Sequence, residues 1–353
     1  MTILFAILLF SFLIFIHELG HFVAAKLSGV QVNEFSMFMG PAIFKKQKGE
    51  TLYSIRCIPI GGYCAMEGEN GDNDSPQAFG KAAWWKRLII LIAGSGMNFI
   101  AGILIMFILF IPVEEVVVPV IDAFEPYSTV NGADGLQVGD RLVELDGEKI
   151  YALSDLDLIF MLNPGQVHDV VVERNGAKLT LSDFEMQRHT VTDEQGNEMQ
   201  LFGMNFATAE ADLPMKIQQA WYSCLNTVRN VRLSLQMLIT GQAGLSDMSG
   251  PVGIVKLMSD TAAASERTLD AVMNMLYFGG FLAINLAVMN LLPIPALDGG
   301  RVVGLLITTA VEKITGKKID PKYEGYLHGA GMILLLGLMA LIMFKDIFVI
   351  FKG

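Results

Sequence analysis

Four stretches of the chain are almost uninterrupted runs of apolar residues and are long enough to cross a bilayer as helices. They cover residues 2–25, 88–112, 272–297 and 327–350. A helix of about 20 apolar residues spans the roughly 30 Å hydrocarbon core of a membrane. The pattern therefore predicts a polytopic α-helical membrane protein with four transmembrane helices.

Shorter, strand-like pieces follow the first apolar run. In residues 40–69, short apolar and polar stretches alternate and are interrupted by Gly40, Gly49, Gly61 and Gly62. This pattern predicts a β-hairpin or small sheet beside the membrane. A free sheet edge can accept an extended peptide as an extra strand, whereas the alternative is a hairpin that only connects two spans.

Residues 115–188 carry the signals of a separate β-rich module. The pattern predicts strands at 116–121 and 142–145, a helix at 153–162, and a hairpin at 170–181 with Asn175-Gly176 as its turn. The segment GLQVGDRLVELDGEKI (135–150) resembles the core of a PDZ domain, with turn signals at both ends of an apolar strand. The resemblance implies that the helix flanks a peptide groove.

Apolar side chains recur at helical spacing in residues 216–241. They are Ile217, Trp221, Leu225, Val228, Leu235 and Leu238. This spacing predicts an amphipathic helix that packs on its own protein, with a position on the lipid surface as the alternative. The segment SGPVGIVK (249–256) then interrupts the chain before the third apolar run.

These patterns divide the chain into four parts. We expect an N-terminal membrane part at 1–112, which contains a cytoplasmic β-loop at 30–70, and a PDZ-like domain at 113–215. An amphipathic helix and linker follow at 216–271, and a C-terminal membrane part covers 272–353.

The distribution of charge predicts which parts lie on which side of the membrane. Of all residues 52% are hydrophobic and 17% are charged, which argues against a soluble domain. Residues 26–87 hold eight Lys and Arg and residues 301–322 hold five, Lys317 and Lys318 among them. The positive-inside rule places both in the cytoplasm. Residues 113–215 hold twenty Asp and Glu against five Lys and Arg, so we expect 113–270 and both termini outside.

The acidic exterior argues against binding of nucleic acid or anionic lipid on that side. The three cysteines do not form a disulfide framework, because Cys57 and Cys64 fall in the reducing compartment and Cys224 is left alone. No Lys or Arg precedes Lys26, so we expect the first run to remain as a span rather than to be a cleaved signal peptide.

The first apolar run contains the motif HELGH, with His17, Glu18 and His21. Residues four apart on a helix lie on one face about 6 Å apart, so the two imidazoles can bind one metal ion. Glu18, one position round the helix, can then reach water at that metal. Each polar residue in a span costs a few kcal/mol, which disfavours the alternative of two histidines that only pack.

Catalytic zinc takes three protein ligands and keeps a fourth position open for water. In NLLPIPALDGGR (290–301), Asp298 lies at the cytoplasmic end of the third apolar run. Pro293 and Pro295 break the helix and let non-helical backbone carry Asp298 inward. The alternatives are a plain helix-ending turn here and His328 as the third ligand. The other two histidines, His168 and His189, lie in the external segment.

Together these motifs resemble those of the site-2-type intramembrane zinc metalloproteases, in the RseP-like bacterial branch that carries a PDZ domain. The resemblance covers nearly the whole chain, through HELGH, MGP (39–41), IPIGGY (58–63), AGSGMNF (93–99), the PDZ core, SGPVGI (249–254) and NLLPIPALDGG (290–300). Two departures occur, because Ser95-Gly96 replaces the usual Gly-Pro and Met39 replaces an aromatic residue. Neither touches an expected ligand.

The resemblance implies a set of roles for residues of this chain. Zn²⁺ would be held by His17, His21 and Asp298, with Glu18 as general base and acid. The remaining implied roles are substrate binding by Asn290, Pro293 and Pro295, support of the site by Asn98, and clamping of the peptide by the strand at Gly61 and Gly62. The implied activity is cleavage of transmembrane segments of single-span proteins, after trimming outside a bacterial plasma membrane. Anti-sigma factors and signal-peptide remnants are substrates of this kind.

Three other classes of protein remain as alternatives. A membrane PDZ scaffold could carry a structural metal, but an open coordination position and the glutamate of HELGH argue against it. A polytopic protease of the prenyl-protein type would lack the external module and the Leu-Asp-Gly turn. A zinc transporter would need a second set of ligands within the membrane.

Overall fold

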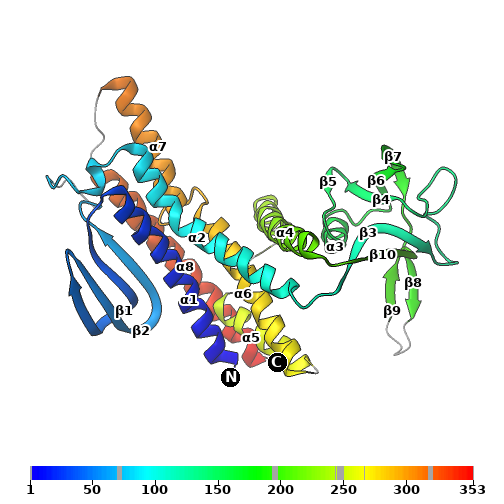
Figure 1. Cartoon of the computed structure of the whole chain (residues 1–353), viewed down its shortest axis with the longest axis horizontal. Helices are drawn as coiled ribbons and strands as arrows, with labels where there is room; N and C mark the ends of the chain where they lie inside the picture. Colours follow the sequence, from blue (N-terminus) through cyan, green and yellow to red (C-terminus); the bar gives the residue numbers. More distant parts are fainter. Residues whose placement is uncertain are drawn as a thin grey trace. The chain divides into compact units, whose positions relative to one another are not determined.

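The computed structural model describes residues 2–69, 74–192, 198–242, 244, 250–265, 267–316 and 321–352. The chain forms two compact units (Figure 1). The first unit combines Met1–Met106 with Thr227–Gly353, and the second is Phe107–Asn226. Both ends of the chain therefore contribute to one unit, and the middle of the chain forms the other.

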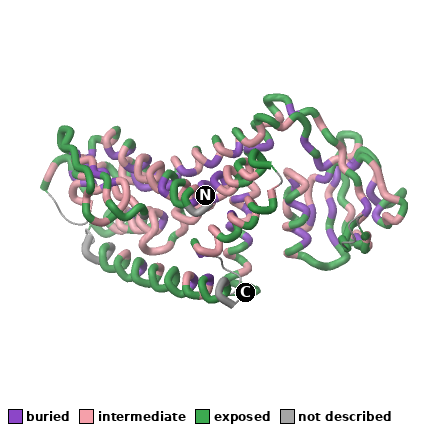
Figure 2. The backbone as a smooth tube through the Cα atoms, turned by 90° about the horizontal axis from the view of Figure 1, so that it is seen from below, coloured by how far each residue is buried: buried purple, intermediate pink, exposed green. Residues whose placement is uncertain are grey.

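Four helices of the structure are long and apolar enough to cross a membrane. They are α1 (Thr2–Ser28), α2 (Trp84–Phe110), α6 (Thr268–Asn290) and α8 (Pro321–Lys352). Much of their apolar surface faces outward, and α8 is exposed along most of its length (Figure 2). The structure thus has four candidate spans, as the sequence predicted, but the third ends at Asn290 rather than at 297, because Pro293 and Pro295 follow.

Two further helices of the first unit were not predicted from the sequence. Helix α5 (Pro251–Ala264) begins where the sequence indicated only an interruption. Proline is tolerated at the start of a helix, and Asp346 of α8 accepts hydrogen bonds from the amides of Gly250 and Gly253, both at 2.9 Å. Helix α7 (Asp298–Thr315) begins at the predicted ligand itself. Ser249, Lys317 and Lys318 lie outside the described residues.

The predicted β-hairpin is formed by β1 (Val32–Lys48) and β2 (Thr51–Met66). Both strands bend, so that residues 34–37 pair with 62–65 on one side and with 52–55 on the other. Residues 42–48 pair with 51–56. Among the described pairings the stretch 62–66 therefore has a strand on one side only and forms an edge of this small sheet.

One hydrophobic core joins the base of the hairpin to three helices. It connects the C-terminal half of α1, the start of α2 and Leu305 of α7 with both strands and with the 3₁₀ helix η1 (Phe79–Lys81). Its buried members are Ala24, Ala25, Val30, Val32, Phe35, Cys64, Met66, Phe79, Ile90, Leu91 and Leu305. In addition to this core, an ion pair between Glu69, just after the hairpin, and Arg301 connects the hairpin to α7. The hairpin is thus fixed to the helices that carry the candidate site.

The second unit contains a six-stranded sheet with the order β10-β3-β4-β6-β7, in which β5 pairs with β4. Its strands are β3 (Glu115–Phe124), β4 (Arg141–Leu145), β5 (Glu148–Lys149), β6 (Val167–Arg174), β7 (Ala177–Glu185) and β10 (Met204–Glu210). Helix α3 (Ser154–Leu162) shares a hydrophobic core with this sheet. Strands β8 (His189–Thr192) and β9 (Glu198–Leu201) form a separate hairpin. The predicted strands, helix and Asn175-Gly176 turn are all present, the turn with φ of 52° and 78°.

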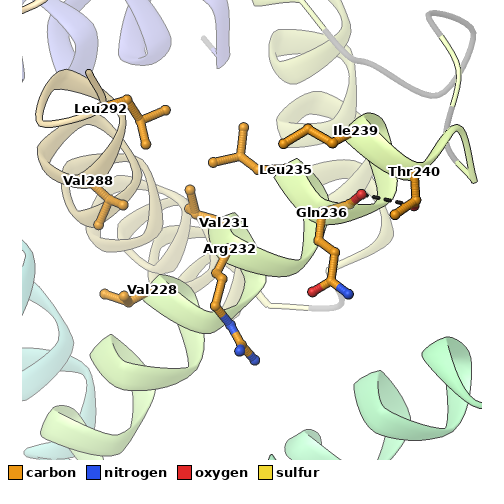
Figure 3. Close-up of a pocket in the computed structure, with 9 residues that line it drawn as sticks. All are labelled: Val228, Val231, Arg232, Leu235, Gln236, Ile239, Thr240, Val288 and Leu292. Atoms are coloured by element: carbon orange, nitrogen blue, oxygen red, sulfur yellow. Dashed lines mark hydrogen bonds between the residues drawn. The ribbon is translucent and has the colours of Figure 1, made fainter. Parts of the chain in front are cut away.

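Helix α4 (Leu213–Thr240) is the predicted amphipathic helix. Its first half belongs to the second unit and its last half to the first. In the first unit a cavity of about 380 Å³ separates this last half from the C-terminal end of α6 (Figure 3). Its lining is mostly apolar and consists of Val228, Val231, Arg232, Leu235, Gln236, Ile239, Thr240, Val288 and Leu292.

Candidate metal centre

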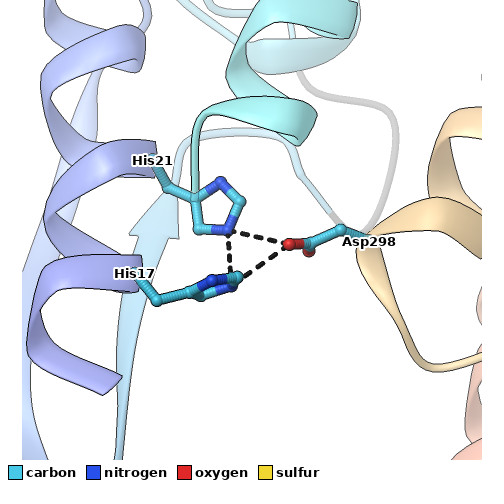
Figure 4. Close-up of side chains that lie close together, drawn as sticks. All are labelled: His17, His21 and Asp298. Atoms are coloured by element: carbon cyan, nitrogen blue, oxygen red, sulfur yellow. Dashed lines mark hydrogen bonds and ion pairs between the residues drawn. The ribbon is translucent and has the colours of Figure 1, made fainter. Parts of the chain in front are cut away.

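Helix α1 presents two histidines on one face, one turn apart. The Nε2 atoms of His17 and His21 lie 3.1 Å from each other, with the two ring planes at 82° (Figure 4). The spacing of four residues places both side chains on one side of the helix. Both imidazoles therefore aim a nitrogen at the same point in space.

Asp298 completes a triangle of donor atoms. Its Oδ2 lies 3.1 Å from Nε2 of His17 and 3.2 Å from Nε2 of His21. Ligands on a tetrahedral zinc ion with bonds of about 2.0 Å are separated by about 3.3 Å. The three atoms thus have the spacing of one face of a zinc coordination tetrahedron, and the fourth vertex remains for water or substrate.

The surroundings of these atoms also fit a cation. Asp298 Oδ2 is buried and makes no hydrogen bond, and the Nε2 atoms of His17 and His21 lie 3.1 and 3.2 Å from it. A buried carboxylate without a hydrogen-bond partner is costly unless an opposite charge compensates it. Within the part of the chain that the structure describes, His17, His21 and Asp298 are the one group of three or more such side chains that could hold a metal.

The second nitrogen of each imidazole has a partner that sets its orientation. Nδ1 of His21 lies 2.8 Å from the carbonyl oxygen of Ile90 and can donate its proton there, which leaves Nε2 free to bind a metal. The buried side chain of Asn98 lies 3.5 Å from Nδ1 of His17. With its amide oxygen turned toward this nitrogen, Asn98 would fix the same tautomer of His17.

Glu18 lies beside the hairpin. A Cβ built on Gly62 of β2 would be 3.3 Å from Cγ of Glu18 and 3.1 Å from the carbonyl oxygen of Ser36. The glycine therefore lets the edge stretch of β2 pass close to Glu18. Its neighbour Gly61 has φ of +78°, which glycine adopts without strain.

Two glycines allow α1 and α2 to approach at the depth of the histidines. A Cβ on Gly94 would lie 2.4 Å from Nε2 of His21 and 2.8 Å from Cε1 of His17. A Cβ on Gly20 would lie 2.3 Å from the carbonyl oxygen of Ala93. Neither glycine is recognisable from the sequence as a residue of the site, although Gly20 stands within HELGH and Gly94 within AGSGMNF.

The other predicted site residues occupy the segment between α6 and α7 and its neighbours. Asn290 is the last residue of α6, and Pro293 and Pro295 lie in the non-helical segment before Asp298. His328 is not part of the group of three, since its Nδ1 accepts a hydrogen bond from the amide of Ala296 at 2.9 Å. Within the second unit, His168 pairs with Asp146 and His189 contacts Thr129.

Comparison with known proteins agrees with this geometry. The model of Peptidase family M50 matches residues 5–338. A protein of Clostridium acetobutylicum that is provisionally named a zinc metalloprotease is 36% identical over 349 residues, which cover 98% of this chain and 97% of that protein. A protein of Fusobacterium nucleatum with the same provisional name is 32% identical over 359 residues and all of both chains. The "Regulator of sigma-W protease RasP" of Bacillus subtilis is 28% identical over 431 residues, with 98% of each chain covered.

Two histidines and a carboxylate converge among apolar helices, and proteins that the chain resembles are named metalloproteases, which together indicate a metalloprotease of the membrane. The chain belongs to Peptidase family M50, the site-2 type of zinc metalloprotease. Its cofactor is Zn²⁺, and the group at His17, His21 and Asp298 fits that ion in spacing and in donor chemistry.

The contact between Gly94 and the histidines leads to a matched test. We expect Gly94→Ala to displace both imidazoles and to lower zinc affinity at least about 10-fold, the loss typical of disturbed supporting contacts. Gly96→Ala is the control, because a Cβ on Gly96 would meet nothing within 4 Å. Zinc retained after dialysis against a chelator measures both. Equal retention by the two variants would contradict the role of Gly94.

Proposed function

We propose that this protein is an intramembrane zinc endopeptidase that cleaves the transmembrane segments of single-span membrane proteins. In this proposal His17, His21 and Asp298 hold the zinc and Glu18 is the general base and acid. The observation that carries it is the convergence of these three ligand atoms at 3.1–3.2 Å, on helix α1 and at the start of α7. Because the chain belongs to Peptidase family M50, the reaction that we assign to this site is peptide-bond hydrolysis.

The bound zinc would act as a Lewis acid on the scissile carbonyl and would lower the pKa of water. Glu18 follows His17 directly, so its side chain is turned about 100° round the helix and lies beside the metal rather than on it. In this position its carboxylate takes the proton of the attacking water and passes it to the leaving amide nitrogen. The Ile90 carbonyl can accept from Nδ1 of His21, and Asn98 lies 3.5 Å from Nδ1 of His17, so the Nε2 atom of each ring is the one turned toward the metal position.

A substrate helix must be locally extended before it can be cut. An α-helix hides its amides in internal hydrogen bonds, and a freed backbone within the membrane needs replacement partners. The edge stretch of β2 at Gly61 and Gly62 passes beside Glu18 and offers the hydrogen-bonding groups of an open sheet edge. We assign the peptide clamp to this stretch, and the opposite wall to Asn290, Pro293 and Pro295.

The cavity between α4 and α6 supports a route for the substrate. Its lining is apolar on most sides and ends at Val288 and Leu292, which flank Asn290 (Figure 3). A transmembrane segment is apolar and would be compatible with such a surface. In the proposed arrangement it enters along α4 and unwinds where α6 ends.

The second unit is proposed as the extracytoplasmic PDZ-like domain of this protease, over residues 113–215. A buried site that cuts transmembrane helices must be kept from cutting every passing span. We propose that this domain excludes proteins with large external parts by bulk, so that substrates trimmed outside reach the zinc. The name of the Bacillus subtilis relative, regulator of sigma-W protease, agrees with regulated proteolysis of a membrane protein such as an anti-sigma factor.

The orientation is also a proposal. Residues 26–87 and 301–322 face the cytoplasm of a bacterial cell, and residues 113–215 lie outside its plasma membrane. The last half of α4, which the sequence placed outside with the rest of 113–270, instead borders the C-terminal end of the membrane helix α6. The exposed indoles of Trp84 and Trp85 at the start of α2, followed by Lys86 and Arg87, support a membrane interface at this end of the helix.

A membrane scaffold with a structural metal is the alternative function. Structural zinc sites are normally closed by four protein ligands. Among the described residues, three side chains converge at this site, and Glu18, a potential base, follows His17 on the same helix. The arrangement therefore favours catalysis.

The division of roles between Glu18 and Asp298 is testable by paired substitutions. Glu18→Gln should lower cleavage by about 10² to 10⁴-fold while zinc remains bound, because the amide cannot take a proton. Asp298→Asn should abolish cleavage and weaken zinc binding. Metal analysis and cleavage of a single-span substrate in detergent measure both effects. Wild-type activity of Asp298→Asn would refute the ligand assignment.

The peptide clamp is testable with two proline variants. Ile60→Pro in the bend of β2 would remove a backbone donor next to Gly61, and we expect cleavage to fall at least about 10-fold with normal zinc content. Ile43→Pro is the control, because Ile43 lies in the stretch 42–48 on the opposite edge of the same hairpin. An equal loss of cleavage in both variants would contradict the peptide clamp and would indicate that the hairpin only connects two spans.

The proposed topology is testable with single introduced cysteines in a chain whose own cysteines are replaced. Gln47→Cys should be protected from a membrane-impermeant thiol reagent in intact cells, and Lys178→Cys in the β6–β7 hairpin should be labelled. The basic and acidic loops predict these outcomes. Labelling at position 47 from outside would overturn the orientation.

The size filter is testable by deleting most of the second unit between two residues that are hydrogen-bonded to each other. The amide of Ala211 donates to the carbonyl of Glu114 at 2.8 Å, so a short flexible linker can replace residues 115–210. We expect the deleted protein to cleave both full-length and pre-trimmed substrate, at similar rates. Loss of cleavage of the trimmed form by a zinc-loaded protein would favour a gripping role instead, and unchanged selectivity would rule out the filter.

A further inference from the structure

The segment between α6 and α7 determines where Asp298 lies. Two backbone hydrogen bonds close short turns within it, from the amide of Ile294 to the carbonyl of Leu292 at 2.7 Å and from the amide of Leu297 to the carbonyl of Ile294 at 3.1 Å. Asp298 follows directly as the first residue of α7. A rotation of this backbone would therefore move the carboxylate away from the two histidines.

Ala296 has an unusual conformation within this segment. Its φ is +79°, in the left-handed region that residues other than glycine, asparagine and aspartate rarely adopt. Alanine has no polar side-chain atom with which to compensate this conformation locally. Such a backbone persists only where its surroundings hold it in place.

His328 of α8 makes the contact that can hold Ala296. Its Nδ1 accepts the amide hydrogen of Ala296 at 2.9 Å. This bond requires the neutral tautomer with the proton on Nε2, because a protonated imidazole has no acceptor. His328 therefore contributes a hydrogen-bond acceptor to the segment, while the carboxylate of Asp298 is aimed at His17 and His21.

A second residue on the same face of α8 brings the helix close to the segment. Gly331 follows His328 by three residues, and a Cβ on it would lie 2.5 Å from Cβ of Pro295 and 2.7 Å from its carbonyl oxygen. The close approach is possible only with glycine. Together His328 and Gly331 fix Pro295 and Ala296 from one side.

We propose that His328 is a positioning residue of the zinc site, which holds Ala296 in its left-handed conformation and thereby places Asp298. This inference rests on the proposed ligand role of Asp298. It differs from a general packing role of His328 in one respect. In the proposed role, zinc binding depends on the hydrogen-bond acceptor at Nδ1 of His328. A substitution that removes the backbone strain at residue 296 should therefore restore zinc binding when this acceptor is lost.

The decisive experiment compares three variants of the full chain in detergent. In His328→Asn, an amide oxygen takes the place of Nδ1, and we expect zinc affinity and kcat within about 3-fold of the wild type. In His328→Leu the acceptor is lost. We expect zinc to be released at least about 10-fold faster into a chelator and kcat to fall by a similar factor, with KM changed much less. In His328→Leu with Ala296→Gly, glycine adopts the positive φ freely, and we expect zinc retention to recover at least about 3-fold.

Hydrogen exchange provides a readout that needs neither zinc nor activity. In the metal-free protein the amide of Ala296 should exchange faster in His328→Leu than in His328→Asn. Tyr326→Leu, at an exposed position of α8, is the control for changes in the helix itself. It should leave zinc release and this exchange as in the wild type.

Two results would overturn the inference. One is wild-type zinc release and exchange in His328→Leu. The other is equal damage in the asparagine and leucine variants with no recovery from Ala296→Gly, which would indicate packing or proton transfer by the imidazole. If Asp298 is not a zinc ligand, Asp298→Asn will bind zinc with wild-type affinity. Hydrogen exchange of the Ala296 amide does not depend on the ligand role of Asp298, so the two failures can be told apart.

Discussion

The structure depends on bringing two imidazoles and one carboxylate together among apolar helices. Asp298 Oδ2 has no hydrogen-bond partner, and a carboxylate in such surroundings is stable only beside a positive charge. A divalent cation held by His17, His21 and Asp298 would satisfy all three groups at once. The same apolar surroundings strengthen the interaction of that cation with a polarised carbonyl, since little water screens it.

Close helix contacts keep the triangle in place. Gly20 and Gly94 let α1 and α2 approach at the depth of the histidines, so that the Ile90 carbonyl can accept from His21. Gly331 does the same between α8 and the segment that leads to Asp298. Membrane helices gain little from hydrophobic association, because lipid is as apolar as their side chains, and small residues at the contacts supply close packing instead. The glycines are therefore part of the zinc site, although none is a candidate ligand.

The hairpin adds a polar backbone edge to an apolar bundle. Because Glu18 lies against Gly62, an extended peptide paired along residues 62–66 would run past the proposed general base. Its amides would gain partners at the moment that the helix gives them up. One short stretch of β2 would thus link the unwinding of a substrate to its hydrolysis. The shared core with α1, α2 and α7 fixes the hairpin to the helices that carry the histidines.

Local sequence determined the features that depend on neighbours along the chain. Apolar runs predicted the four spans, the spacing of His17 and His21 predicted a shared helix face, and Asn175-Gly176 predicted a tight turn, because length, period and φ are local properties. Helices α5 and α7 were missed, since α5 depends on a cap from Asp346, far along the chain. Asp298 was selected from its motif, but its approach to the histidines depends on how α7 packs. The contacts of Gly94, and of His328 with Ala296, were decided by tertiary structure alone, because they join segments that no periodicity relates.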